Sequence, residues 1–137
     1  MVKIFLDTNV VIDLLGKRQP FYEDAKLFLT LAQKELVKLF IAESSLGNLY
    51  YLAFEVYKIP HADETMHDFF SICGVVSGGK EIIFQSLNSG FKDKEDGLQY
   101  FTAVSNKMDF LITRDKKDFK SAIGKIPILS PKEFFES

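Results

Sequence analysis

Residues 2–15 read VKIFLDTNVVIDLL, and this stretch decides the fold class. The first five residues form a short run rich in β-branched and aromatic side chains, and the run stops at Asp7. From Val10 to Leu15 the apolar residues recur at helical spacing. The stretch therefore predicts a strand, a tight turn and a helix, which together form the repeating unit of an α/β domain.

The rest of the chain repeats this alternation of strand and helix. Gly16 ends the first predicted helix, and Pro20 stands where the first turn of a second helix accepts proline. The alternation predicts a parallel sheet covered on both faces, and the lack of repeats or linkers predicts one domain over 1–137. Further predicted strands cover 36–42, 75–76, 110–113 and 126–129, and predicted helices cover 21–32, 46–57, 61–72, 93–107 and the segment from Pro131. The segment 81–87 could be a strand or a helix, and we favour a helix.

Two of these helices have a marked stripe along one side, which we expect to face the core. In the helix over 46–57 the stripe is strongly apolar, and in the helix over 93–107 it is mixed. The first stripe consists of Leu46, Leu49, Tyr50, Ala53, Phe54 and Tyr57, and the second of Leu98, Phe101 and Ser105.

The composition narrows the class of protein. There are 17 Lys and Arg against 19 Asp and Glu, a formal net charge of −2, so any binding of nucleic acid must be local. One cysteine, Cys73, excludes an intramolecular disulfide, and two histidines are too few for a typical zinc cage. With no apolar run of membrane-spanning length, we expect a cytoplasmic protein with no membrane partner.

Acidic residues follow two predicted strands and open one predicted helix. Asp7 and Asp115 each end a strand, and Asp96 lies one turn after Asp93 on one face of a helix. In open parallel sheets ligands bind at the carboxyl ends of the strands. Clustered carboxylates repel one another unless a cation compensates, and oxygen ligands select a hard ion such as Mg²⁺ or Mn²⁺. The pattern favours metal-assisted hydrolysis of a phosphodiester.

Each acid also has a structural explanation when it is considered alone. Asp7 could cap the helix that follows it, as Asp commonly does. Asp93 and Asp96 lie in the first turn of a helix, where the helix dipole favours negative charge. Asp115 and Asp118 could belong to a polar turn. Their occurrence together at two strand ends and one helix start favours a shared site.

Four segments, in order, resemble the PIN-domain family, and in particular its VapC-like toxin ribonucleases. IFLDTNVVIDLL (4–15) is similar to the family's opening, and KDKEDGLQYFTA (92–103) to its central acidic helix. FLITRDKKDF (110–119) and IPILSPKEFF (126–135) resemble its late strand and its ending. The resemblance implies a three-layer α/β/α fold with a central parallel sheet of four to five strands.

The resemblance also implies roles for individual residues. Asp7, Asp96 and Asp115 would be the catalytic, metal-binding acids, with Mg²⁺ or Mn²⁺ as cofactor. Thr8 and Asn9 would steady the first turn, Thr113 would hydrogen-bond within the site, and Asp93 and Asp118 fall at positions that are often acidic. Apart from the resemblance, Arg114, Lys116 and Lys117 belong to a basic run late in the chain, which is either an ordinary solvated surface or a set of RNA contacts.

One position departs from the family pattern. Many PIN nucleases carry a Glu in the helix after the second strand, and here that position is Asn48, in the segment GNLYYL. A neutral amide binds a metal ion more weakly than a carboxylate does, unless Glu43 at the start of the helix reaches the site. Glu43 could equally be a residue that complements the helix dipole. GNLYYL resembles a subgroup of the family that lacks the Glu.

The sequence thus leads to a metal-dependent endoribonuclease, expected to be the toxin of a type II toxin–antitoxin pair. RNA, an antitoxin protein and a second copy of the chain are the expected partners. The alternative is a non-catalytic module that binds RNA or protein and has an impaired metal site, as Asn48 would suggest. A phosphatase with Asp7 as its nucleophile is disfavoured, because such enzymes carry a second Asp where Asn9 stands.

Overall fold

The protein is built on one five-stranded parallel sheet with the strand order β3-β2-β1-β4-β5. The structure, a computed structural model, describes residues 1–120, 122 and 124–136. All the strand pairs are parallel, which confirms the predicted α/β class with a central parallel sheet. The strands are β1 (Val2–Leu6), β2 (Val37–Ala42), β3 (Cys73–Val76), β4 (Phe110–Ile112) and β5 (Ile128–Leu129).

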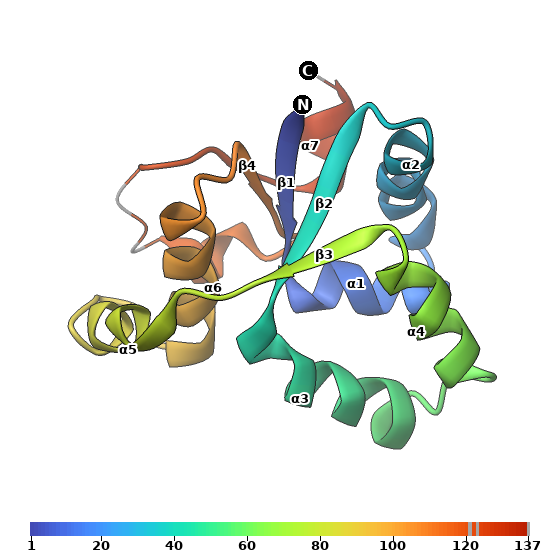
Figure 1. Ribbon diagram of the computed structural model, residues 1–137, viewed down its shortest axis with the longest axis horizontal. Coiled ribbons are helices and arrows are strands. Elements are labelled where there is room, and N and C mark those ends of the chain that lie inside the picture. Colours follow the sequence, from blue (N-terminus) through green and yellow to red (C-terminus); the bar gives the residue numbers. More distant parts are fainter. Residues whose placement is uncertain (121, 123, 137) are drawn as a thin grey trace.

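Helices cover both faces of this sheet, so the domain has three layers (Figure 1). On one side lie α5 and α6, and on the other lie α1, α2 and α4. The helices are α1 (Thr8–Leu15), α2 (Tyr22–Gln33), α3 (Leu46–Tyr50), α4 (Ala62–Phe70), α5 (Gly79–Leu87), α6 (Lys94–Ser105) and α7 (Pro131–Glu136). Two 3₁₀ segments, η1 (Glu43–Ser45) and η3 (Lys116–Phe119), and one π-helical segment, η2 (Tyr51–Val56), complete the described elements.

Each face of the sheet has its own core. On one side, residues of β1 and β2 pack with α1, α2 and α4, and Phe28 of α2 contacts the rings of Phe134 and Phe135 in α7. On the other side, Phe5, Tyr100 and Leu111 form a second cluster with Phe119 of η3. Because β1 is central and buried on both faces, its carboxyl end lies between the two cores, where α1 begins.

Two predicted helical stripes do not coincide with the buried faces. In the segment over 46–57, Leu49 and Ala53 are buried, but Tyr50, Phe54 and Tyr57 remain exposed. This segment is also not one regular α-helix, because it passes from α geometry in α3 to π geometry in η2, directly after the 3₁₀ segment η1.

In α6 the predicted stripe is wrong. Leu98 and Phe101 are only half-buried and Ser105 is exposed, whereas the buried residues are Gly97, Gln99, Tyr100, Thr102 and Ala103. Two of these are polar, and each has a hydrogen bond that compensates its burial. Gln99 Oε1 accepts from the backbone N–H of Thr8 at 3.3 Å, and Thr102 Oγ1 donates to the carbonyl oxygen of Leu98 at 2.7 Å. A pattern of apolar residues alone could not identify that face.

Candidate active site

Asp7 follows β1 and lies almost wholly buried, with 4% of its surface exposed. Its backbone N–H donates to the carbonyl oxygen of Ile112 at 3.0 Å, which ties the end of β1 to the end of β4. Its side chain makes no cap hydrogen bond to α1; instead, the Thr113 hydroxyl donates to Asp7 Oδ2 at 2.8 Å. Burial raises the pKa of the Asp7 carboxyl, and the hydrogen bonds from Thr113 and Gln99 partly offset that rise.

Asp115 stands two residues beyond Thr113 and is held from two sides. Its backbone N–H donates to Thr113 Oγ1 at 3.1 Å, so one hydroxyl connects the Asp7 carboxylate with the turn that carries Asp115. The Asn9 amide donates to Asp115 Oδ2 at 3.2 Å. Asn9 and Thr113 therefore join the ends of β1 and β4 through side chains.

The third acid comes from the start of α6. Asp93 caps this helix, because its Oδ1 accepts from the backbone N–H groups of Glu95 at 2.8 Å and Asp96 at 3.4 Å. Asp96 is half-buried, and its pKa is raised to about 7, first by burial and then by the charges of Asp93, Asp7, Asp118 and Glu95. Asp93, Asp96 and Asp118 line one cavity, and the charge of Asp7 also contributes to the raised pKa of Asp96.

We call the group of Asp7, Asp93, Glu95, Asp96, Asp115 and Asp118 the acidic cluster. Within residues 1–120, 122 and 124–136, no three acidic, His or Cys side chains stand close enough, as placed, to hold a metal ion. The donors nevertheless suit a hard divalent cation, because all of them are carboxylates. The hydroxyl of Thr8, next to Asp7, is buried without a hydrogen-bond partner in the described part of the chain. The residues present therefore fit such an ion chemically.

Asn48 and Glu95 form a contact that the sequence analysis missed. The Asn48 amide donates to Glu95 Oε1 at 3.2 Å, across a sequence separation of 47 residues. Glu95 thus brings a carboxylate to the neighbourhood of the position where many family members carry a Glu. The sequence feature that could have indicated Glu95 is its position directly before Asp96 in the first turn of the helix. Glu43 is exposed and lines a different cavity with Ser77 and Ile82.

The family model for the PIN domain matches residues 3–117, which is most of the chain. The chain belongs to the PIN-domain family. The match includes every residue of the acidic cluster except Asp118, which lies in η3 just beyond the matched range.

Known proteins similar to this PIN domain share its whole length. Ribonuclease VapC1 of Aquifex aeolicus (strain VF5) is 22% identical over 139 residues, covering 98% of this chain and 94% of the relative. The crystal structure of DNA-bound VapBC from Salmonella typhimurium contains a chain with a TM-score of 0.72 at 19% identity, covering 96% of this chain and 99% of that one. VapBC2 from Rickettsia felis, bound to a fragment of its promoter DNA, gives 0.67 at 18% identity, with 93% and 97% covered. The two structures support the three-layer fold.

Of the three basic residues considered as RNA contacts, Lys117 borders the acidic cluster and has no ion pair among the described residues. The other two are paired with carboxylates. Arg114 pairs with Asp13, and Lys116 Nζ lies 3.0 Å from Glu133 Oε2. Lys117 lines a cavity of about 260 Å³ together with Asp93, Asp96 and Asp118. The sequence analysis missed two further lysines of this cavity, Lys92 and Lys120.

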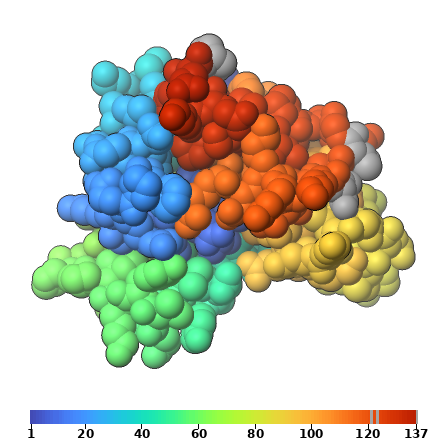
Figure 2. Space-filling view, turned by 180° about the vertical axis from the view of Figure 1, so that it is seen from behind, coloured from blue at the N-terminus to red at the C-terminus, as the bar shows by residue number. Residues whose placement is uncertain are grey.

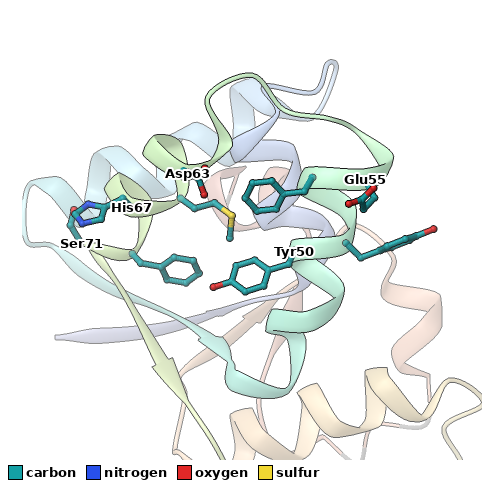
Figure 3. Close-up of a pocket in the computed structure, with 9 residues that line it drawn as sticks. Tyr50, Glu55, Asp63, His67 and Ser71 are labelled. Carbon is teal, nitrogen blue, oxygen red and sulfur yellow. The ribbon is translucent and has the colours of Figure 1, made fainter.

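A larger cavity lies elsewhere in the PIN domain. It is a groove of about 860 Å³ between α3–η2 and α4, and Figure 3 shows Tyr50 and Glu55 on one side and Asp63, His67 and Ser71 on the other. Tyr50 and Phe54, which do not enter the core, line this groove, which is mainly apolar. Cys73 in β3 is buried and its pKa is raised to about 12, so it is an inert core thiol. No helix within the described residues is long and apolar enough to cross a membrane.

Proposed function

We propose that this PIN domain is a cytoplasmic endoribonuclease that hydrolyses RNA phosphodiester bonds with the help of Mg²⁺ or Mn²⁺. The observation that carries the proposal is the position of Asp96. It lines one cavity with Asp118, and the charges of Asp7 and Asp118 help to raise its pKa although both residues are distant in sequence. So many carboxylates in one region are tolerable only if they are protonated or share a cation. The similar Ribonuclease VapC1 supports the same reaction class.

Asp7, Asp96 and Asp115 would hold the ion. When bound, a divalent cation supplies an activated water and offsets negative charge on the phosphate. The protein's own groups keep the acids in place. The Thr113 hydroxyl holds the Asp7 carboxylate, and the Asn9 amide holds that of Asp115.

Further residues would complete the site around these acids. Glu95, held by Asn48, supplies negative charge beside Asp96 and partly replaces the Glu absent from position 48. Lys92, Lys117 and Lys120 would bind RNA phosphates next to Asp96.

The decisive test compares charge-removing variants of nearly constant shape. Asp96→Asn and Asp115→Asn should each lose RNA cleavage by at least about a hundredfold while remaining folded, because electrostatic groups at an active site contribute on that scale. A mixed RNA pool would be incubated with Mg²⁺, Mn²⁺ or a chelator, and products resolved on a denaturing gel. The exposed Asp63→Asn is the matched control and should cleave normally. Cleavage retained in both variants, or undiminished by chelator, contradicts the proposal.

Two observations favour a second function. Asn48 is a neutral amide that donates to Glu95, and no three acidic, His or Cys side chains of the described residues lie close enough to hold a metal ion. The protein could bind RNA or another protein without cutting RNA. Calorimetry with Mn²⁺ separates the two functions, because a nuclease requires binding that Asp7→Asn weakens. Millimolar or weaker binding that Asp7→Asn leaves unchanged would support the non-catalytic module.

We further propose that the protein is the toxin of a type II toxin–antitoxin pair. The support is its likeness over nearly the whole chain to proteins named VapC and VapBC. Its partners would then be RNA as substrate, a small antitoxin that blocks the acidic cluster, and a second copy of the chain as in similar toxins.

A further inference from the structure

One buried carboxylate next to the acidic cluster has no role in the proposed chemistry. Asp13 lies in α1, only 1% of its surface is exposed, and two arginines surround it. Arg18 Nη1 lies 3.3 Å from Asp13 Oδ1, and Arg114 Nε lies 2.8 Å from Asp13 Oδ2. Burying a carboxylate is costly unless it is paired, so this arrangement needs a structural or functional reason.

Arg18 and Arg114 each lie over an aromatic ring, but Arg114 makes two hydrogen bonds to Asp13 where Arg18 makes one. Besides the 2.8 Å contact, Arg114 Nη2 donates to Asp13 Oδ1 at 3.5 Å, so two nitrogens face the two carboxylate oxygens. The Arg114 guanidinium also lies over the ring of Phe21, 4.1 Å from the centroid. Figure 2 shows the orange segment after β4 beside the blue segment that follows α1. A guanidinium fixed in this way is not free to meet an RNA phosphate.

Arg114 lies between two residues of the candidate site in the chain. Its neighbours on either side are Thr113, whose hydroxyl donates to Asp7, and Asp115, whose carboxylate accepts from Asn9. The turn after β4 therefore presents alternate residues to two different partners. Thr113 and Asp115 face the acidic cluster, and Arg114 faces α1 and Asp13.

We propose that Arg114, anchored by Asp13, is a positioning residue that fixes the turn holding Thr113 and Asp115, and that it does not contact RNA. This inference rests on the proposed function, since it concerns the readiness of Asp115 to bind a divalent cation. Groups that orient metal ligands typically contribute about ten- to a hundredfold to metal affinity. Arg18 acts on the same carboxylate from the loop after α1, so it has no part in holding Asp115.

The two arginines provide a matched pair of variants. The experiment measures Mn²⁺ affinity by calorimetry on the full chain without RNA, for the parent, Arg114→Gln and Arg18→Gln. We expect about tenfold weaker binding for Arg114→Gln and a change of less than about threefold for Arg18→Gln. Both variants should lower the melting temperature, because each leaves the buried Asp13 with one cation fewer. A purely structural role would therefore affect both variants alike, whereas positioning separates them.

A double variant guards against misfolding. Asp13→Asn combined with Arg114→Gln removes both charges of the pair, and it should fold and bind Mn²⁺ as weakly as Arg114→Gln alone, because the two residues act together. Parent-like Mn²⁺ affinity in Arg114→Gln overturns the inference, as does an equal loss in Arg18→Gln. Weaker RNA binding at unchanged Mn²⁺ affinity would make Arg114 an RNA contact instead. If the parent itself binds no Mn²⁺, the proposed function fails first and the inference with it.

Discussion

At Asp96, burial and the charges of neighbouring acids both disfavour the ionised carboxylate. Its pKa is raised to about 7 by burial and by four neighbouring acids, and burial also raises the pKa of Asp7. A carboxyl group with a raised pKa in the folded state favours folding where it is protonated. That contribution is fully present below the unfolded-state pKa, about 4, and is lost as pH rises through the folded-state value. Without a cation, the folded protein should therefore be less stable at neutral pH than at acidic pH.

The melting temperature in the presence of chelator should accordingly fall as pH rises from about 4 to about 7, the unfolded-state and folded-state pKa values of Asp96. Asp96→Asn should flatten this fall and melt higher than the parent at pH 8, because an amide cannot ionise. Mn²⁺ should raise the melting temperature of the parent at pH 8 and have much less effect on the variant. A thermal melt monitored by circular dichroism checks all three results, with the exposed Asp63→Asn as control. A parent melting temperature that rises with pH over this range would contradict the charge conflict.

The helix α6 carries two of the acids at its start, and its Gly97 packs closely against the neighbouring helix α5. A Cβ built on Gly97 would lie 2.6 Å from Ser86 Oγ in α5, and that hydroxyl donates to the carbonyl oxygen of Lys94 at 2.9 Å. Gly97 thus allows the first turn of α6, and with it Asp96, to sit against α5. Gly47 in α3 has the opposite surroundings, since no atom of the described residues, apart from its chain neighbours and the backbone of its own helix, lies within 4 Å of its Cβ position.

Gly97→Ala should destabilise the protein by about 1–3 kcal/mol, because it overpacks this contact. Gly47→Ala should instead be neutral or stabilise by up to about 1 kcal/mol, because alanine is the better helix former. Urea unfolding measures both changes. Ser86→Ala removes the hydroxyl in the way, so Gly97→Ala should cost less when made in the Ser86→Ala background. An unchanged cost in that background would show that the hydroxyl is not what Gly97 accommodates.

The sequence could predict α6 as a helix with acids at its start, but not how the helix faces its neighbours. Helical spacing and the cap at Asp93 are local features, and local features can be recognised in a sequence. Burial of Gln99 depends on a hydrogen bond to Thr8, 91 residues away, and no local pattern contains it. The same holds for the pairs Asn48–Glu95 and Asp13–Arg114, which join residues far apart in the sequence.

For the whole molecule, a net charge of −2 means that RNA must be attracted locally. The structure places Lys117 in the cavity beside Asp96, while its neighbour Lys116 pairs with Glu133 of α7. Two adjacent lysines in one segment therefore differ in what they can offer to a phosphate.

RNA binding should distinguish these two lysines. Lys117→Gln should reduce the slope of log affinity against log salt by about 0.7, the value for one phosphate contact on a single strand. Lys116→Gln should change the slope much less. Fluorescence anisotropy with a labelled RNA can measure both, with Asp96→Asn present throughout to prevent cleavage. Equal effects of the two changes would assign no special role to the cavity beside Asp96.

The central place of β1 in the sheet has a consequence for how the protein is made. β1 leaves the ribosome before the other four strands of this sheet, yet the hydrogen bond between Asp7 and Thr113 joins residues 106 positions apart. A nascent chain therefore carries Asp7 long before the strand that completes its surroundings has been synthesised. If the product attacks RNA, this order of assembly keeps it harmless to the ribosome and message that produce it until synthesis is well advanced.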